Sequence, residues 1–499
     1  MSRKITDIVV HDVRFPTSVR HEGSSDSMLD RVDHSCTYVI LDTDTTEYKG
    51  YGIAATLGRG NEFVVQTCKL IFELRVKNRT TEEIYSDFAK FWRELTTDVE
   101  LRWLGPECGV VHLATAAIVN ALWDLWARIE GKPVWKLLAD MTPEQLVSTV
   151  DFRYITDVVT KEEAIQMLKE NQDKEKKEKT LRSEGYPTYT SDVGRYTLRK
   201  QQVRSACSKF KKLDFTSFKT IVGPQVPESE YRCNVIRSVV GRKVRLMVDA
   251  SQICESANKA ITVVKGIKKT RPYCIEDPTS ADDALEHTTI LNELRTLKVK
   301  VTCGKTCANR VMFKQFLKIG DTDFWSINVG RLGGVNEALA VYFMARKHNS
   351  KFATNDNYFY YILIILESDY LVESIFAEQN KTIFFVLLIE PVWGHAGGVG
   401  LGEMIQHLQI WNHICLGART DTDTDGMIEF VSHQHGYFVD PVFIRNAHYL
   451  LPQRPGFSTQ LKNKCIARWS YPEGTRWKFI IQKKKEEKEK EKQKKKKRT

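Results

Sequence analysis

The sequence predicts a closed barrel of parallel strands and helices that follows a smaller α+β domain. Three observations predict this: a length of 499 residues, short alternating segments over the first 150 residues, and a repeated pattern of apolar runs and amphipathic helices after about residue 151. A chain of this length usually divides into a small and a larger domain. A repeated strand-plus-helix unit is typical of a parallel sheet covered by helices, and this many units favour a closed barrel over an open sheet.

The first 150 residues contain the segments "ITDIVVHDVRF", "TYVILDT" and "YKGYGIAATLG", whose alternation predicts an antiparallel meander. The stretch "HLATAAIVNALWDLWARIEGKPVWKLL" then repeats apolar residues at three- and four-residue steps, which predicts a helix that ends at Gly131 and Pro133. His112 lies on this pattern, so we expect it to pack between helices rather than to bind a ligand. The charged run at 161–180 predicts one exposed helix.

The barrel prediction depends on six apolar runs that end in a polar residue, namely "SFKTIVG", "RLMVDAS", "PYCIEDPTS", "KVTCGKT", "FWSINVG" and "PVWGHAGG". The polar positions of the first five runs are Lys219, Asp249, Glu276, Lys305 and Asn328, and they are separated by 30, 27, 29 and 23 residues. Each separation is the length of one strand-plus-helix unit. Because the strand C-termini of such barrels carry the active site, we expect these side chains to face one another across the barrel mouth.

The next polar position, His395, follows Asn328 after 67 residues, about 40 more than one unit needs. The excess falls at about 350–390, is rich in Tyr, Phe, Ile and Leu, and lies in a helix-to-strand connection on the bottom face of the barrel. Two interpretations stay open. The segment is either an inserted oligomer contact or a sequence foreign to the fold, such as translated non-coding sequence. Its apolar side chains predict aggregation unless they are buried.

The net charge of +11 is concentrated at the C-terminus. Residues 482–499, "QKKKEEKEKEKQKKKKRT", carry +7, which leaves about +4 for the rest of the chain. We expect the tail at 481–499 to be a solvated, disordered extension, with an anchor on nucleic acid or an acidic membrane as the alternative. The remaining balance is ordinary for an enzyme and predicts no specific nucleic-acid partner.

Cysteine usage and the apolar runs indicate the compartment. Eleven cysteines without a CxxC pair fit free thiols in a reducing environment. The N-terminus enters a strand pattern at once and shows no signal-peptide block. The longest apolar runs, at 358–366 and 383–389, are too short to span a bilayer. We therefore expect a soluble intracellular protein of the cytosol or mitochondrion, without a membrane span.

The strand ends indicate metal-assisted acid–base chemistry. Acidic residues on three successive strands would suit Mg²⁺, which prefers oxygen ligands. Asp249 and Glu276 supply two, whereas the third strand presents Lys305, whose ammonium cannot bind a metal. Lys219 and His395 would stand opposite as general base and acid. The structural alternatives are strand-end caps or ion pairs for the two carboxylates, and a turn residue for His395.

Eight motifs that span nearly the whole chain apart from the insertion and the tail carry a family resemblance. They are "HDVRFPTS", "RWLGPECGVVHLATAAIVNALWDLWARIEGKPVWKLL", "DFRYITDV", "IEDPTSADD", "NRVMFKQ", "RLGGVNE", "GHAGGVGL" and "YPEGTRWK". In order and spacing they resemble the mandelate racemase subgroup of the enolase superfamily, and within it the L-fuconate dehydratases. The resemblance implies a modified (β/α)₇β barrel, one Mg²⁺, and dehydration of a sugar acid to a 2-keto-3-deoxy acid after a base removes the proton next to the carboxylate.

The resemblance also implies a division of the chain. Residues 1–150 would form the N-terminal capping domain, and 151–430 the barrel with its probable insertion at 350–390. Residues 431–480 would complete the cap, and 481–499 would form the tail.

Residue by residue, the metal site and the base site depart from the family pattern. Asp249 and Glu276 match the first two metal carboxylates, but Lys305 stands where the family has a glutamate. Lys219 matches the first, supporting lysine of a Lys-x-Lys strand, while the position of the second lysine, the base, is Ile221.

The residues that would protonate the leaving hydroxyl match the family pattern only in part. His395 matches the catalytic histidine and Glu429 a glutamate that hydrogen-bonds the substrate or enolate. The aspartate that orients the histidine is Asn328 here. The loop "YPTYTSDVGRY" lacks the Trp-Leu-Gly core of the family, which changes the substrate contacts.

These departures predict weak Mg²⁺ binding and impaired dehydration of a small sugar acid. The alternative is an inactive pseudoenzyme with a binding or regulatory role, in which Lys305 pairs with Asp249 and Glu276 in place of the metal. Two further hypotheses are a lyase that uses Lys219 or deprotonated Lys305 as base, and a binding protein that acts through its lysine-rich tail. A homo-oligomer is compatible with each of them.

Overall fold

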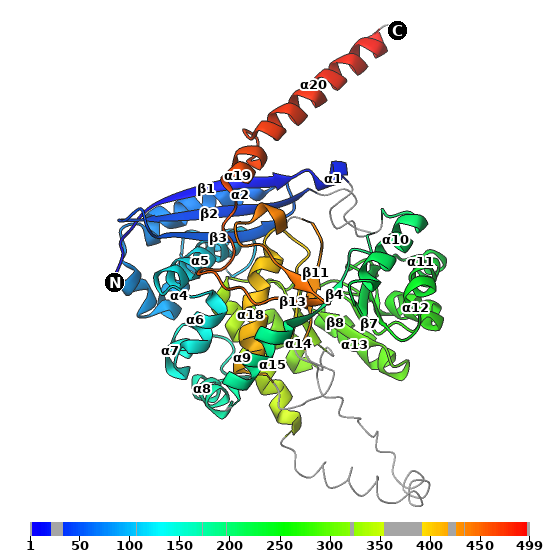
Figure 1. Cartoon of the computed structure of the whole chain (residues 1–499), viewed down its shortest axis with the longest axis horizontal. Helices are drawn as coiled ribbons and strands as arrows, with labels where there is room; N and C mark the ends of the chain where they lie inside the picture. The colour runs from blue at the N-terminus through cyan, green and yellow to red at the C-terminus, as the bar shows by residue number, and fades with distance from the viewer. Residues whose placement is uncertain are drawn as a thin grey trace, which may run out of the picture.

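An antiparallel sheet with helices packed against it forms the N-terminal cap, and a ring of parallel strands surrounded by helices forms the barrel (Figure 1). The computed structural model describes residues 2–20, 33–105, 107–171, 173–195, 197–319, 324–353, 392–417, 426–433 and 435–496.

The cap begins with a three-stranded meander in the order β1-β2-β3, as the alternating segments predicted. Its elements are β1 (Ile5–Phe15), α1 (Thr17–Arg20), β2 (His34–Thr43), β3 (Lys49–Thr56), α2 (Asn61–Ile71), η1 (Phe72–Val76), α3 (Thr81–Tyr85), α4 (Phe88–Thr96), η2 (Arg102–Leu104), α5 (Gly109–Ile129), α6 (Val134–Asp140) and α7 (Pro143–Ser148). Helix α5 crosses β3 so closely that a Cβ on Gly52 would overlap the carbonyl oxygen of Ala117.

Helix α5 is the core helix of the cap. Its sequence is long and apolar enough to cross a membrane, yet 83% of its apolar window is buried inside the protein. The helix ends at Ile129, and Gly131 follows with a positive φ of 64°, as the Gly-x-Pro signal predicted. His112 is buried on α5, where its Nε2 lies 2.6 Å from Glu337 Oε2, so the prediction of a packing role is confirmed.

The barrel contains eight parallel strands, and pairing of the last strand with the first closes it. The strands are β4 (Tyr186–Thr190), β5 (Ser217–Ile221), β6 (Arg245–Asp249), β7 (Cys274–Glu276), β8 (Lys300–Cys303), β9 (Phe324–Ile327), β10 (Trp393–Gly394) and β11 (Ile428–Phe430). The six predicted strand runs are β5 to β10. The first and last strands, in "YPTYT" and "GMIEF", have no separate prediction.

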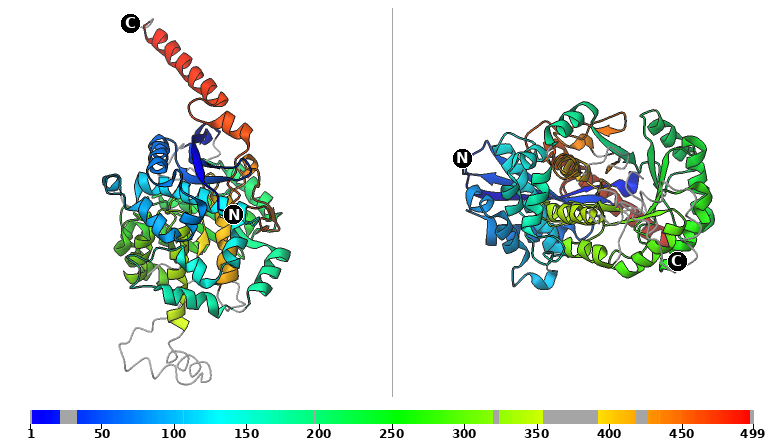
Figure 2. Two further views of the ribbon diagram at one scale, coloured as in Figure 1. Left: turned by 90° about the vertical axis from the view of Figure 1, so that its left-hand side faces the viewer. Right: turned by 90° about the horizontal axis from the view of Figure 1, so that it is seen from below.

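Helices follow the first seven barrel strands. They are α10 (Lys200–Lys211), α11 (Val226–Val240), α12 (Ala257–Ile267), α13 (Ala284–Thr296), α14 (Arg310–Ile319), α15 (Val335–Ala353) and α18 (Leu401–Cys415), with the short η3 (Lys268–Thr270) after α12. No barrel helix follows β11 in the described residues, so the expected (β/α)₇β pattern is confirmed. Helices α10 to α13 lie on the side of the barrel away from the cap sheet (Figure 2).

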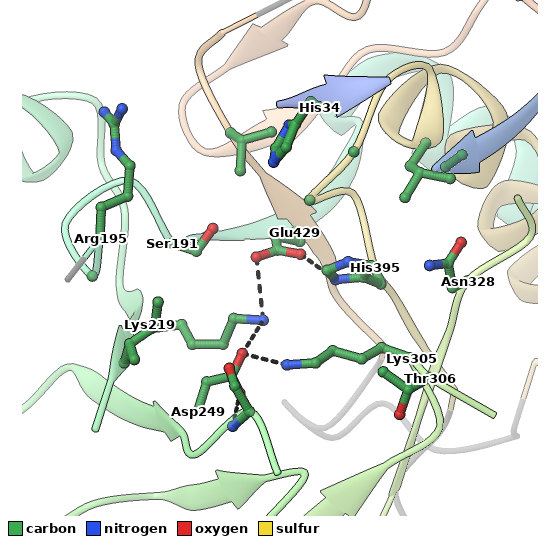
Figure 3. Close-up of a pocket in the computed structure, with 18 of the residues that line it drawn as sticks. His34, Ser191, Arg195, Lys219, Asp249, Lys305, Thr306, Asn328, His395 and Glu429 are labelled. Atoms are coloured by element: carbon green, nitrogen blue, oxygen red, sulfur yellow. Dashed lines mark hydrogen bonds and ion pairs between the residues drawn. The ribbon is translucent and has the colours of Figure 1, made fainter. Parts of the chain in front are cut away.

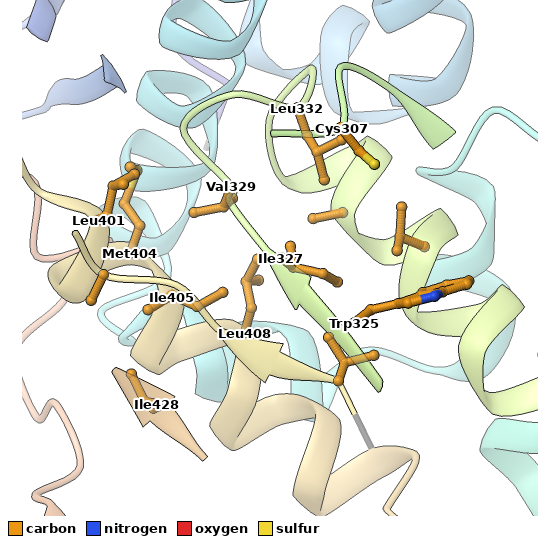
Figure 4. Close-up of a cluster of buried hydrophobic side chains, with 14 of the residues drawn as sticks. Cys307, Trp325, Ile327, Val329, Leu332, Leu401, Met404, Ile405, Leu408 and Ile428 are labelled. Carbon is orange, nitrogen blue, oxygen red and sulfur yellow. The ribbon is translucent and has the colours of Figure 1, made fainter. Parts of the chain in front are cut away.

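The interior between β9 and α18 shows how the barrel core is built (Figure 4). Leu401, Met404, Ile405 and Leu408 follow the i, i+3, i+4, i+7 spacing of one helix face, and all are buried. This face packs toward β9, whose Ile327 is also buried. The strand that carries Asn328 at its end is therefore fixed by the core.

The chain after β11 adds a short hairpin to β4 of the barrel and also packs against the cap. Its elements are η4 (His435–Tyr437), β12 (Ile444–Arg445), β13 (His448–Tyr449), α19 (Asn463–Trp469) and α20 (Thr475–Lys496). Phe15 of β1 stacks on Tyr437 with ring centroids 4.7 Å apart and lies 5.8 Å from the ring of Trp469. The indole of Trp477 donates a hydrogen bond to the carbonyl of Arg14 at 2.8 Å.

Two segments differ from the sequence-based expectation. The run at 161–180 forms two helices, α8 (Lys161–Glu170) and α9 (Lys174–Glu184); α8 ends at its C-cap residue, Asn171, whose backbone is extended and whose side-chain amide donates a hydrogen bond to the carbonyl of Ile414. The tail, expected to be disordered from residue 481, continues helix α20 to Lys496, and this helix projects from the body (Figure 1). Alternating Glu and Lys favour helix in an exposed segment. The insertion predicted at 350–390 falls largely at 354–391, outside the described residues.

Candidate active site at the barrel mouth

A pocket of about 380 Å³ opens at the C-terminal ends of the barrel strands. Lys219, Ile221, Asp249, Lys305, Asn328, His395 and Glu429 line it together with cap residues. His34 of β2 faces the same space from the cap (Figure 3). The structure therefore brings seven of the eight predicted site residues to one cavity, and the eighth, Glu276, contacts two of them from below.

Strand register explains this convergence. In the parallel pairing, Ile221 of β5 lies opposite Asp249 of β6, and Asp249 lies opposite Glu276 of β7. Lys219 and Ile221 are two residues apart on one strand, so their side chains share the inner face. Lys305 follows the end of β8, and each of the remaining site residues lies in or directly after its strand.

Lys305 points into the carboxylate cluster. Its Nζ lies 2.5 Å from Asp249 Oδ2, 3.6 Å from Glu276 Oε2 and 3.7 Å from Asp277 Oδ2. The predicted pairing of Lys305 with Asp249 and Glu276 is thus confirmed. Burial alone would raise the pKa of Asp249, but the attraction of Lys305 and Lys219 more than offsets it and lowers this pKa to about 2.

Lys219 is the second buried cation. Its Nζ lies 2.6 Å from Glu276 Oε2, 3.2 Å from Glu429 Oε1 and 3.4 Å from the hydroxyl of Tyr189. Burial would lower the pKa of Lys219, but Glu276 and Glu429 raise it well above its usual value. Lys219 therefore stays protonated and cannot accept a proton near neutral pH, which argues against the hypothesis that it serves as a base.

His395 lies between Glu429 and Asn328 (Figure 3). Its Nδ1 lies 2.6 Å from Glu429 Oε2, at ion-pair distance but outside hydrogen-bond angles. The side-chain oxygen of Asn328 accepts a hydrogen bond from the backbone of Gly330, and among the described residues no hydrogen bond joins Asn328 to His395. The histidine of this chain lies beside a glutamate, whereas the resemblance implies an orienting aspartate.

The residues present do not fit a Mg²⁺ ion. An ammonium nitrogen occupies the position beside Asp249 that a divalent cation would need, and the described residues contain no cluster of three or more His, Cys, Asp or Glu side chains able to hold a metal. Mg²⁺ requires nearly complete octahedral oxygen coordination. Two carboxylates that are already neutralised by Lys305 and Lys219 do not provide it.

Sequence reasoning missed three groups at the site. Asp277 directly follows Glu276 and is buried, and burial raises its pKa to about 7, which Lys305 only partly offsets. Tyr189 lies in the "YPTYT" strand, whose position in the barrel was not recognised. Arg331 of the "RLGGVNE" motif lines the pocket. The first could have been found from the doubled acid in "IEDPTS", whereas the other two carry no local signal.

Comparison with known proteins places the chain beside a group of related sequences. A family model described as Enolase C-terminal domain-like matches residues 201–364. The chain is 39% identical over 480 residues to human mitochondrial enolase superfamily member 1, which covers 96% of this chain and 98% of that protein. It is 36% identical over 479 residues to L-galactonate dehydratase from Hypocrea jecorina, with coverage of 95% and 96%.

Solved structures give the same picture. The crystal structure of human mitochondrial enolase superfamily member 1 matches with a TM-score of 0.85 at 39% identity and covers 96% of this chain and 99% of that chain. L-talarate/galactarate dehydratase from Salmonella typhimurium LT2, liganded with Mg and L-lyxarohydroxamate, matches with a TM-score of 0.65 at 16% identity, with coverage of 94% and 93%. The second likeness shows the fold alone.

Proposed function

The chain belongs to the enolase superfamily, and from this premise we propose that it binds a sugar acid at the barrel mouth and dehydrates it only poorly. L-fuconate and L-galactonate are the acids to test first. The observation that carries the proposal is the 2.5 Å contact between Lys305 and Asp249, because it puts a lysine ammonium beside the carboxylate that would otherwise bind the metal ion. The similarity to L-galactonate dehydratase over 95% of the chain supports the choice of substrate class.

The reaction makes demands that this site meets in part. Dehydration removes the proton from the carbon next to the carboxylate and expels the neighbouring hydroxyl as water. The resulting enol then becomes a 2-keto-3-deoxy acid. Ile221, at the position of the base, carries no group that accepts a proton, and loss of a general base costs about 10²–10⁴-fold in rate.

The lack of a fitting metal site is the second feature that limits the rate of dehydration. Superfamily members use Mg²⁺ with a Lys or His base, and the residues here do not fit that ion. Lys305 provides a fixed positive charge in its place, but its charge is shared among Asp249, Glu276 and Asp277. Little of it remains to stabilise a developing enolate, and electrostatic stabilisation of this kind is usually the largest single contribution to the rate.

The acid side is better preserved. His395 lines the pocket and stays close to Glu429, so it can still donate a proton to a leaving hydroxyl. Without an aspartate its orientation is less fixed, as in sites where an orienting carboxylate is replaced by an amide.

A second candidate is a protein without turnover that has a binding or regulatory role. The ion pairs of Lys219 and Lys305 favour it, because they neutralise the buried carboxylates without any added ion. Both candidates share the sugar-acid ligand and differ only in the residual rate.

Calorimetric titration and an assay for 2-keto-3-deoxy acid test the proposal together. We expect the purified full-length chain to bind L-fuconate or L-galactonate, to show no heat of Mg²⁺ binding, and to turn over slowly or not at all. Tight Mg²⁺ binding with rapid turnover would contradict the proposed impairment. Absence of binding to any sugar acid would contradict the proposed ligand. A residual rate above the buffer control would favour the first candidate over the second.

We also propose a location in the cytosol or mitochondrion. The described cysteines are all free thiols, and relatives carry the word mitochondrial in their names. Fractionation of cells that express the tagged chain tests this location.

A further inference from the structure

The guanidinium of Arg331 lacks the carboxylate partner that the other lysines and arginines of the pocket have. Those other residues are Lys219, Lys305 and Arg195. The first two make close ion pairs with the carboxylate cluster, and Arg195 lies 3.7 Å from Asp192. Within the described residues, Arg331 has no carboxylate within 4.0 Å, and its side chain donates no hydrogen bond.

The two buried arginines among the described residues, Arg14 and Arg310, both have carboxylate partners. Arg14 pairs with Asp12 and Glu62, and the buried Arg310 lies 3.0 Å from both Glu107 and Glu337. Removing a charge from water costs free energy unless a partner compensates it. Burial lowers the pKa of Arg331, and the attraction of Asp277, which lies beyond ion-pair distance, offsets this only in part.

Arg331 lies in a loop that borders the pocket. It follows β9 in the loop that begins at Asn328, and its backbone N–H donates a hydrogen bond to the carbonyl of Asn328 at 3.1 Å. Its guanidinium nitrogens are not among the buried atoms that lack a partner, so they remain accessible. The amide nitrogen of Asn328 likewise donates no hydrogen bond within the described residues. One loop therefore offers two unused donors to the pocket.

We propose that Arg331 receives the carboxylate of the sugar acid, with Asn328 as a second donor beside it. Guanidinium and carboxylate form two parallel hydrogen bonds, which suits a planar carboxylate better than a hydroxyl. This inference rests on the proposed function and adds where the acid group binds. The carboxylate thereby lies toward the β9 loop instead of the corner occupied by Lys305, and binding becomes independent of Mg²⁺.

Calorimetry with paired ligands tests the assignment. L-galactonate and galactitol differ in that only the first carries a carboxylate. We expect the unaltered chain to bind L-galactonate more tightly than galactitol, with no change on addition of EDTA. Arg331→Gln should weaken L-galactonate binding roughly 10–100-fold, as for loss of a charge-assisted hydrogen bond, and leave galactitol binding unchanged. Arg331→Lys should lie between, because lysine keeps the charge but not the planar pair of donors.

Arg204→Gln on α10 is the matched control, because Arg204 is exposed and its guanidinium donates a hydrogen bond to Ser238, away from the pocket residues. It should bind both ligands like the unaltered chain. Circular dichroism and thermal unfolding establish that each variant is folded, and Arg331→Met replaces Arg331→Gln if the latter is not.

The outcomes separate the two proposals. Equal binding of L-galactonate by the unaltered chain and Arg331→Gln would overturn the assignment and leave the proposed function standing. Loss of binding in EDTA would overturn it as well, because the carboxylate would then depend on a metal. Failure of the unaltered chain to bind any sugar acid would overturn both.

Discussion

Ile221 lies opposite Asp249 in the register of β5 and β6, so an apolar side chain borders the carboxylate that Lys305 neutralises. Two departures from the family pattern are therefore neighbours. Ile221 provides no proton acceptor, and Lys305 replaces a metal ligand next to it. Restoring the base without the metal site, or the metal site without the base, should therefore have little effect on turnover.

Lys305→Glu should create a divalent-metal site. The substitution removes the competing ammonium and adds a third carboxylate to Asp249 and Glu276, which gives the oxygen ligands that Mg²⁺ prefers. We expect saturable Mg²⁺ binding by calorimetry and an unfolding temperature that rises with Mg²⁺ and falls in EDTA. Lys305→Gln is the matched control, because it removes the cation without adding a charge. Mg²⁺ binding by the Gln variant or none by the Glu variant would contradict the prediction.

Ile221→Lys combined with Lys305→Glu should raise dehydration of L-fuconate or L-galactonate. The added amine would stand beside Asp249 on the inner face of β5, and a placed general base contributes about 10²–10⁴-fold. Ile221→Lys alone should stay near the rate of the unaltered chain. The assay measures 2-keto-3-deoxy acid, and Ile221→Met controls for the change in volume. A double variant no faster than either single variant would refute the proposed division of roles.

Lys219→Met should destabilise the protein by about 3–5 kcal/mol, because it removes the cation that lies between the buried carboxylates of Glu276 and Glu429. Burial would raise the pKa of Glu429, but Lys219 and His395 lower it well below its ordinary value. This contribution to stability is present above the ordinary glutamate pKa and is lost as the pH falls. Urea unfolding should therefore show a larger penalty at pH 7.5 than at pH 4. The exposed variant Lys318→Met should cost less than about 1 kcal/mol, and an equal penalty at both pH values would argue against the ion pairs.

Asp277→Asn should stabilise the protein at pH 8 and have little effect at pH 4.5. Burial raises the pKa of Asp277 to about 7 in the folded state, so the folded protein holds a proton there that the unfolded chain has released. Stability consequently falls as the pH rises from the ordinary aspartate pKa to about 7. Thermal unfolding at the two pH values measures the difference. Asp157→Asn, an exposed partner of Lys314, should give no gain at pH 8.

Truncation after residue 481 should leave the stability of the body within about 0.5 kcal/mol. The described side chains beyond this point are exposed, and their contacts stay within the helix, as in the 3.9 Å pair of Lys483 and Glu487. Trp477→Ala should cost about 3–5 kcal/mol, because this indole is buried against β1 and donates to Arg14. Equal unfolding midpoints for the Trp477 variant and the unaltered chain would show that this packing adds nothing.

The regular spacing of Lys219, Asp249, Glu276, Lys305 and Asn328 was enough to predict the barrel and the convergence of its strand ends. That prediction succeeds because each strand and its helix are local in sequence and repeat with one period. The pairing of Lys305 followed from charge alone.

Contacts between segments that are distant in the sequence could not be predicted in this way. The resemblance supplied Glu429 only as a matched glutamate, and its 2.6 Å contact with His395 depends on the parallel pairing of β11 with β10, which no local pattern predicts. The side chain of Asn171, where α8 ends, bonds to a carbonyl of α18 more than two hundred residues later. Arg331 stands out only because, among the described residues, its guanidinium has no ion-pair or hydrogen-bond partner.

The aromatic packing of Phe15 against Tyr437 and Trp469 has a consequence for biosynthesis. The first strand leaves the ribosome hundreds of residues before the rings that shield it. During translation this surface has no native cover, so the nascent chain should engage chaperones until Tyr437 and Trp469 have emerged, and messages that end before the codon for Tyr437 should yield insoluble product.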